Sequence, residues 1–239
     1  MNSKIFIRHG SKSSVRLVDI TKLAAALGRD VCTALMGLHP WTGCDTISAF
    51  AGQGKLKALK ILLHEQKFTD AFATLGTSWN VTNELFCIIE EFVCQLYCRN
   101  TKIIKVNELR YQMFRSRRGE IESAQLPPCE DTLTQHTRRA NYQAAIWRQS
   151  LVNSPDTPNS NQGHGWTTSE DGSLVNKWMT GSLAPEVVLS LLSCKCARSC
   201  RPSDCTCIVH GLKCTAACKL QTCSNMASDD DEPEHDQQD

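Results

Sequence analysis

Apolar residues recur at helical spacing along most of the chain, which predicts a mainly helical protein. The clearest case is residues 82–97, where leucine, isoleucine, phenylalanine and valine follow one face at intervals of three and four residues. A helix at residues 30–38 is expected to stop before Pro40, because proline lacks the N–H that continues a helix. The helices predicted from the pattern are 21–27, 30–38, 55–66, 82–97, 106–116, 131–151 and 184–192.

Short β-strands interrupt this pattern at two places. Residues 4–8 and 15–20 are extended runs near the start of the chain. Residues 166–170 and 173–178 flank Asp171-Gly172, a strong signal for a two-residue hairpin turn. Residues 153–165 are rich in Asn, Ser, Pro and Gly, a composition typical of a linker.

Charge is distributed unevenly along the 239 residues. The net charge is +1, but residues 228–239 carry seven acids and no Lys or Arg, so the rest of the chain carries +8. A basic body is compatible with a polyanionic partner, whereas the acidic tail is expected to be solvated and disordered. No long apolar run resembles a signal peptide or a membrane span, which predicts a soluble intracellular protein with no membrane partner.

The fourteen cysteines fall into two sets. Six are scattered over the first 193 residues in mostly apolar surroundings, where small buried thiols are expected. Eight follow within 30 residues that have too few large apolar side chains to fold by burial alone. Metal binding supplies about 10 kcal/mol per structural zinc in comparable modules, and zinc is the usual ion of all-thiolate sites. A disulfide knot is the alternative. The predicted zinc ligands are Cys194, Cys196, Cys200, Cys205, Cys207, Cys214, Cys218 and Cys223.

Their spacing, Cys-x-Cys-x3-Cys-x4-Cys-x-Cys-x6-Cys-x3-Cys-x4-Cys, resembles one CXC repeat of the tesmin-type cysteine-rich family. The segment 211–215 and the closing Cys-x-Asn strengthen the resemblance. It implies a cluster of three zinc ions held by nine cysteines, some of them bridging, and several family members bind DNA. This chain departs from the pattern at Leu220, where the eighth of the nine cysteines is expected, and at Asp204, where DNA-binding members commonly carry tyrosine.

Eight thiolates satisfy two zinc ions in separate four-cysteine sites, whereas three ions need more bridging, a water or another ligand such as His210. Five cations surround the cysteines against the single acid Asp204, a local charge of +4 before any charge on the cluster. These cations are either phosphate contacts or a solvated surface. The predicted nucleic-acid contacts in this module are Lys195, Arg198, Arg201 and Lys213.

A second motif lies near the start of the chain, where Gly43-Cys44-Asp45 precedes Gly52-Gln53-Gly54-Lys55 and a basic helix. Two glycines before a helix allow backbone N–H groups to approach a phosphate. The spacing does not match a Walker P-loop, so ATP binding is not expected. The wider pattern resembles the helix–two-turn–helix of the flap-endonuclease branch of PIN-like nucleases.

That resemblance implies that Asp45 is a catalytic metal carboxylate, with bound Mg²⁺, and that Gly52, Gly54, Lys55 and Lys57 contact phosphate near a bound K⁺. A two-metal site needs several acids to hold its ions. Asp19 and Asp30 are the only acids before Asp45, so Asp45 alone cannot build it. The chain is therefore expected not to be an enzyme, with Asp45 vestigial or capping a turn; a nuclease fragment completed by other sequence is the alternative.

The middle of the chain resembles the segment that joins these two motifs in uncharacterised animal proteins of mobile-element origin. The expected fold is mainly α with short β-strands, plus a small zinc-stabilised cysteine-rich module. The expected function is that of a nuclear or nucleocytoplasmic zinc-binding protein that associates with nucleic acid or chromatin. A zinc-stabilised scaffold for protein partners is a further alternative, and no small-molecule substrate is evident. The expected parts are a partial PIN-like segment (1–75), a helical region (76–152), a linker with hairpin and short helix (153–193), the CXC module (194–225) and an acidic tail (226–239).

Overall fold

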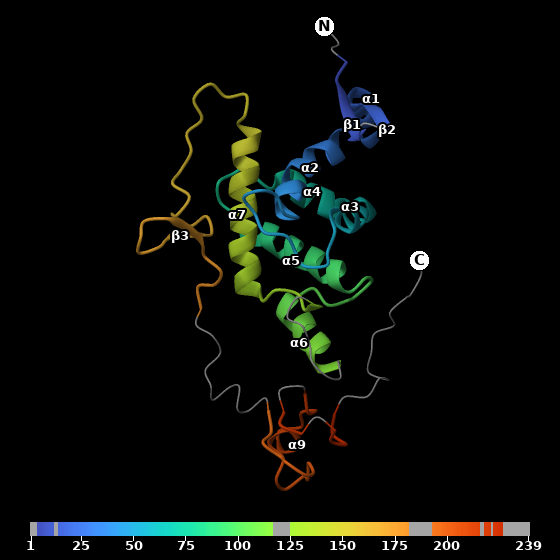
Figure 1. The fold of residues 1–239 in the computed structure, drawn as a ribbon, viewed down its shortest axis with the longest axis vertical. Helices are drawn as coiled ribbons and strands as arrows, with labels where there is room; N and C mark the ends of the chain where they lie inside the picture. Colours follow the sequence, from blue (N-terminus) through green and yellow to red (C-terminus); the bar gives the residue numbers. More distant parts are fainter. Residues whose placement is uncertain are drawn as a thin grey trace.

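The computed structural model describes residues 4–11, 14–116, 125–181, 193–215, 218–220 and 222–226. These residues are mainly helical, with two short hairpins and a cysteine-rich C-terminal segment, which confirms the predicted fold class in its coarse form. The helix expected at 184–192 and the tail after residue 226 lie outside them. Figure 1 shows the elements β1 (Phe6–Ser11), β2 (Ser14–Asp19), α1 (Ile20–Leu27), α2 (Arg29–Trp41), α3 (Lys55–His64), α4 (Gln66–Thr74), α5 (Asn83–Tyr97), α6 (Val106–Ser116), α7 (Glu130–Arg148), β3 (Trp166–Thr168), β4 (Leu174–Asn176) and α9 (Thr206–Val209).

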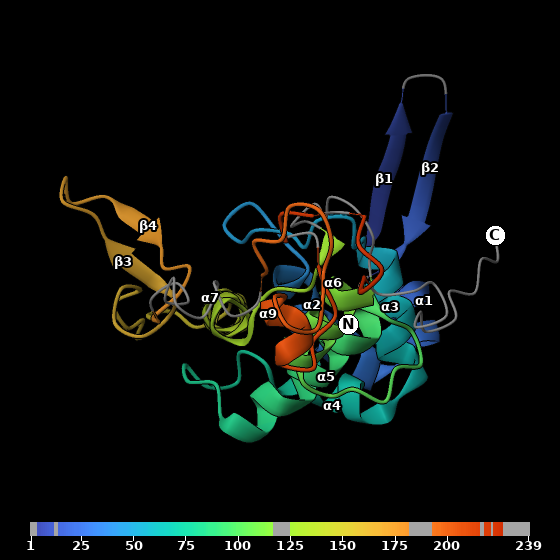
Figure 2. The same cartoon turned by 90° about the horizontal axis from the view of Figure 1, so that it is seen from below.

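Strands β1 and β2 form an antiparallel hairpin that extends away from the helices (Figure 2). The hairpin leads directly into α1, whose N-terminus is capped by Asp19: its carboxylate accepts the backbone N–H of Lys22 at 3.0 Å. A cap of this kind satisfies one of the free N–H groups of the first turn. The predicted pair of extended runs is therefore confirmed as a hairpin joined to a helix.

Strands β3 and β4 form the second antiparallel hairpin, whose connection contains the predicted Asp171-Gly172 but runs from Ser169 to Ser173, longer than the two-residue turn expected. Gly172 has a φ of 83°, a left-handed conformation that glycine adopts without strain. The Asp171 carboxylate accepts the backbone N–H of Ser173 at 3.1 Å, which closes the turn locally.

Helix α2 continues through Pro40 to Trp41, so the prediction that it stops before the proline was wrong. A proline in the last turn removes only one backbone hydrogen bond, and the neighbouring carbonyls at the helix end find other donors. The hydroxyl and the N–H of Thr42 both donate to the carbonyl of Leu38, at 2.8 and 2.9 Å. The extra turn matters because it carries Trp41 into the core.

The basic helix predicted at 55–66 is α3, which ends at His64, two residues earlier than predicted. Glu65 is extended with φ −132° and ψ 124°, and a separate helix, α4, begins at the next residue. Helix α4 was not predicted, although Phe68, Ala71 and Phe72 have the spacing of a buried helical face. All three are buried against the neighbouring helices, so tertiary packing stabilises a helix that is only nine residues long.

Trp41 lies at the centre of the helical core and is fully buried. Its ring centroid lies 4.6 Å from that of Phe50, 5.3 Å from Phe72 and 5.5 Å from Phe92. Its indole N–H donates to the Thr137 hydroxyl at 3.4 Å. One side chain therefore joins α2, α4, α5, α7 and the loop before α3, and contributes both apolar burial and a satisfied polar group.

Helix α7 contributes polar side chains to this core. Burial lowers the pKa of His136 to about 4, so the ring is neutral, and its Nε2 lies 2.8 Å from the carbonyl of Trp41. The Asn141 amide accepts the backbone N–H of Gly76 and donates to the carbonyl of Ser78, both at 2.8 Å. These contacts satisfy loop backbone groups that would otherwise be buried without partners.

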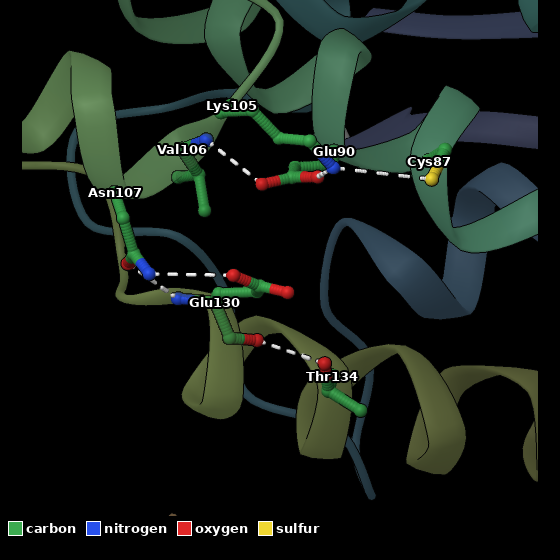
Figure 3. Close-up of polar contacts among 7 residues, drawn as sticks. All are labelled: Cys87, Glu90, Lys105, Val106, Asn107, Glu130 and Thr134. Atoms are coloured by element: carbon green, nitrogen blue, oxygen red, sulfur yellow. Dashed lines mark hydrogen bonds and ion pairs between the residues drawn. The ribbon is translucent and has the colours of Figure 1, made fainter. Parts of the chain in front are cut away.

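A buried carboxylate fixes α6 against α5 (Figure 3). Glu90 is fully buried; one oxygen accepts the N–H of Val106, the first residue of α6, at 3.0 Å, and the other accepts from the Lys105 ammonium at 2.8 Å. The adjacent Asn107 then reaches α7, where its side-chain oxygen accepts the N–H of Glu130 at 2.9 Å. Three helices are joined at this point through side chains that bind backbone groups at helix N-termini.

Replacing Glu90 by alanine is expected to lower the free energy of unfolding of the helical body by about 1–3 kcal/mol, because the Val106 N–H is left buried without an acceptor. The neighbouring Glu91→Ala is the control, since it removes only a more exposed ion pair to Lys67 at 2.7 Å and should cost less than about 1 kcal/mol. Urea unfolding followed by tryptophan fluorescence measures both losses. Equal losses in the two variants would contradict the role given to Glu90.

Candidate metal centre

The C-terminal cysteines lie on tight turns around the short helix α9. Cys205 is its N-cap and Cys207 lies within it. The chain later reverses so that Cys214 donates its N–H to the carbonyl of Asn225 at 2.9 Å and forms a parallel bridge with Met226. These backbone contacts gather cysteines that are up to 29 positions apart in the sequence, and the buried ones are Cys194, Cys205, Cys207, Cys214 and Cys218.

Three groups of thiols are close enough to bind a metal ion, because the sulfur atoms of each group all lie within 4.8 Å of one another. Group two is fully buried, whereas groups one and three each contain half-buried members. Together the groups contain all eight predicted ligands. Group one is Cys194, Cys196, Cys200 and Cys205; group two is Cys194, Cys207, Cys214 and Cys218; group three is Cys200, Cys214 and Cys223.

The sulfur separations fit tetrahedral zinc. Four sulfurs that each lie about 2.3 Å from one ion are about 3.8 Å apart. The distance is 3.8 Å between the sulfurs of Cys194 and Cys200 in group one, and 3.6 Å between those of Cys207 and Cys218 in group two. A disulfide bond is about 2.05 Å long, and none of the fourteen cysteines, all of which lie in the described ranges, forms one, so the structure does not contain the alternative disulfide knot.

Three sulfurs are shared between groups and lie at the corners of a nearly equilateral triangle. Cys194 belongs to groups one and two, Cys200 to groups one and three, and Cys214 to groups two and three. Their separations are 3.8 Å (Cys194 to Cys200), 3.9 Å (Cys194 to Cys214) and 3.8 Å (Cys200 to Cys214). Each corner can therefore bridge two neighbouring ions, so the groups form one connected centre rather than separate sites.

Group three is one ligand short. It contains two shared sulfurs and only Cys223 of its own, whereas groups one and two each contain four sulfurs. The resemblance to CXC repeats predicts a further cysteine at Leu220, which is half-buried and has no donor atom. His210, the other predicted ligand, is exposed at the end of α9 and belongs to none of the groups found among the described residues.

Burial opposes the ionisation of several of these thiols. It raises the pKa of Cys207 to about 12, and it also raises the pKa of Cys200 and of Cys214. Cys205 and Cys218 differ: burial opposes their thiolates too, but backbone N–H donors and the adjacent thiols lower both pKa values, that of Cys205 to about 7. A coordinated metal ion deprotonates its thiol ligands, so the ion supplies the charge that this packing requires.

Hydrogen-bond donors also point at the sulfurs. The Asn225 amide donates to the sulfur of Cys214 at 3.3 Å and to the carbonyl of Leu212 at 3.0 Å. The backbone N–H groups of Cys194 and Thr215 both approach the sulfur of Cys218 at 3.4 Å. Donors of this kind stabilise thiolates and orient metal ligands. The sequence showed Asn225 only as part of a Cys-x-Asn motif, so its contact with a shared sulfur is a result of the structure.

The basic residues of the module surround the cysteines. Lys213 is half-buried, and the acid Asp204 is exposed. The remaining cations face solvent, where they are free to meet an anionic partner. These exposed cations are Lys195, Arg198, Arg201 and Lys219.

The N-terminal glycine motif forms a loop that leads into α3. Gly52 has a left-handed φ of 70°, and Gly54 is the N-cap of the helix with no side-chain cap. The Lys55 ammonium points back to the end of α2, where it donates to the carbonyl of His39 at 2.9 Å and to that of Gly43. Lys55 therefore closes a helix end, and the backbone of Gly52 and Gly54 is exposed beside it.

Two further residues of this motif have simple surroundings. Lys57 donates to the side-chain oxygen of Gln53 at 2.9 Å, one turn earlier. Asp45 is exposed on a short turn closed by paired backbone hydrogen bonds between Cys44 and Ile47, at 2.9 and 3.2 Å. In the described part of the chain, Asp45 belongs to no group of acids, cysteines or histidines that could hold a metal ion.

Comparison of the chain with protein-family models, curated proteins and solved structures finds no match. The resemblances to CXC repeats and to PIN-like nucleases therefore remain predictions that rest on the residues themselves. None of the helices in the described ranges combines the length and apolar character needed to cross a membrane. The cysteine centre is the one feature in these ranges whose geometry defines a binding chemistry, namely thiolate coordination of a metal ion.

Asn225→Ala is expected to weaken zinc binding by about 10–100-fold, because the shared sulfur of Cys214 loses its side-chain donor. Competition with a chromophoric chelator measures the affinity of the full chain. The adjacent exposed Ser224→Ala is the matched control and should leave the affinity unchanged. Equal affinities for Asn225→Ala and the parent chain would show that this hydrogen bond does not support the metal.

Proposed function

We propose that the chain is a zinc-binding protein whose C-terminal module is a single cluster of three thiolate-bridged zinc ions. The observation that carries this proposal is the triangle formed by the sulfurs of Cys194, Cys200 and Cys214, each of which belongs to two ligand groups. Two separate four-cysteine sites would use each sulfur once, so they do not require any sulfur to belong to two groups. The resemblance to the CXC repeat supports the same arrangement independently.

The role of the metal is structural in this proposal. The second buried cluster consists of cysteines with only a few apolar neighbours, such as Ile208, Leu212 and Met226. Burial of so few side chains does not offset the conformational entropy of ordering the module. Zinc coordination supplies the missing free energy, so the module folds as the ions bind.

The module then presents its cations to nucleic acid. Eight thiolates and three Zn²⁺ ions carry a net charge of −2, and the five cations and Asp204 add +4, so the loaded module carries +2. A positive surface on a rigid metal core suits phosphate contacts without base reading, and Asp204 argues against a specific DNA sequence. The glycine backbone at Gly52 and Gly54 is the proposed second phosphate contact.

This proposal includes nuclear or chromatin association and an origin in a mobile element, both of which rest on the sequence resemblances. A nuclease role for Asp45 is not part of it, because a two-metal reaction requires several carboxylates around the ions. The chain therefore binds nucleic acid without cutting it.

Zinc content tests the metal proposal. The full chain purified under reducing conditions should contain three zinc ions by native mass spectrometry, and a chelator should remove them together with the fold of the module. Cys214→Ser should cost more zinc than Cys196→Ser, because the sulfur of Cys214 serves two groups and that of Cys196 serves one. A chain that contains no zinc would refute the proposal, and equal losses in the two variants would refute the sharing.

Binding to a mixed-sequence DNA duplex at several salt concentrations tests the nucleic-acid proposal. If the exposed cations contact phosphates, the logarithm of the affinity should fall with the logarithm of salt, and Lys195→Ala or Arg201→Ala should each reduce the slope by about 1. Lys67→Ala is the control, because Lys67 lies in the helical body and pairs with Glu91. Binding without salt dependence, or no binding, would favour a scaffold for protein partners.

A further inference from the structure

We propose that the third ion of the cluster takes its fourth ligand from outside the chain, and that this ligand is a thiolate. The inference rests on the proposed three-zinc cluster and concerns group three alone. Five sulfurs belong to one group and three belong to two, so the eight cysteines fill eleven of the twelve positions that three tetrahedral ions offer. The unfilled position belongs to the ion held by Cys200, Cys214 and Cys223.

The part of the chain that the structure describes offers no substitute. Leu220 has only carbon in its side chain, and neither His210 nor Asp204 belongs to a ligand group. A zinc ion with three protein ligands and an open position is typical of sites that bind an exchangeable ligand, whereas structural sites have four protein ligands. Groups one and two each offer the four protein ligands of a structural site, whereas group three offers three and leaves one position open.

Group three is also accessible. Every member of group two is buried, but Cys200 and Cys223 are half-buried. Solvent therefore reaches two of the three residues of group three, so a ligand from outside can approach this side of the cluster without unfolding the module. The shared Cys214 stays buried and keeps the third ion attached to the rest of the cluster.

Charge favours an anionic fourth ligand. If a shared thiolate divides its charge equally between two ions, the ions of groups one and two each have ligands of total charge −3 and a local charge of −1. The ligands of group three total only −2, so its ion is locally neutral. Binding one thiolate brings it to −1, equal to its neighbours. The cations Lys195, Lys213 and Lys219 of the same module compensate the added charge.

The chemistry of the donor selects sulfur. All eight ligands of the cluster are soft thiolates, and zinc in such surroundings prefers to complete its shell with a further thiolate. When an external thiol binds, a zinc–sulfur bond forms and the thiol proton passes to solvent, with no oxidation or reduction. The ligand is either a free small thiol or a cysteine of another protein molecule.

Native mass spectrometry of the full, zinc-loaded chain with reduced glutathione as the probe tests this inference. One glutathione should bind per three-zinc chain, and S-methylglutathione, which has no free thiol, should not bind. The adduct should disappear under denaturing conditions, because a coordinate bond is lost with the fold whereas a mixed disulfide would persist. A persistent adduct would overturn the proposal.

Leu220→Cys is the decisive variant, because it supplies a ligand from within the chain. It should lose the glutathione adduct, and a chelator should extract its third ion at least about tenfold more slowly, since even the loss of a second-shell partner changes metal affinity by about 10–100-fold. Leu220→Ala is the matched control and should retain the adduct and the faster extraction. If Leu220→Cys retained the glutathione adduct and released its third ion as fast as Leu220→Ala, the inference would be overturned.

The remaining outcomes separate the source of the ligand. A zinc-dependent dimer that Leu220→Cys abolishes would support the inference with a protein cysteine as the ligand, and the exposed Cys87 of a second copy is then tested by Cys87→Ser. His235 lies outside the described ranges and is the remaining histidine beyond the cysteines; loss of the third ion in His235→Ala would show that the ligand comes from the chain itself and would overturn the inference. If the parent chain contained only two zinc ions even in the presence of glutathione, the inference would be overturned although the chain binds zinc. If the chain contained no zinc at all, the proposed function itself would be refuted.

Discussion

The sharing of three sulfurs is the interaction on which the cysteine-rich module depends. The sulfurs of Cys194, Cys200 and Cys214 lie 3.8–3.9 Å apart, close enough to repel as thiolates and correctly placed to bridge cations. The same packing that raises the pKa of buried thiols without metal makes the module a strong metal ligand. In the proposed zinc-bound state the fold and the chemistry of the module depend on the same event, because a bound ion would supply the charge that completes the fold.

The helical body is stabilised in a different way. Its aromatic core is centred on Trp41, and its buried polar side chains, such as Glu90 and Asn141, bind backbone groups at helix ends and loops. Apolar burial is large enough there to order the chain without a metal. The body is therefore stabilised by its core packing, whereas the module, in the proposed function, is stabilised by its ions.

This difference bears on function. Lys55, which the sequence placed in a phosphate-contact motif, uses its ammonium to close α2, so packing of the body occupies a cation that could have served a ligand. In the proposed function the metal takes the place of a core in the module, which would leave the side chains around it for contact with a partner. The exposed cations and the accessible group three both follow from building a fold on sulfur and metal with few apolar residues.

The sequence by itself determined much of the secondary structure and which cysteines could hold a metal. Periodicity predicted α5 and α6 within a residue, because their apolar faces are long and regular, and cysteine spacing singled out the eight cysteines that the structure gathers into three groups. It could not show that α2 passes Pro40, because tertiary contacts of Trp41 and Thr42 stabilise that turn. It also left open whether eight cysteines form two sites or three. Only the tertiary structure decided which sulfurs are shared and that the deficit lies in group three, because sharing depends on distances between residues far apart in the chain.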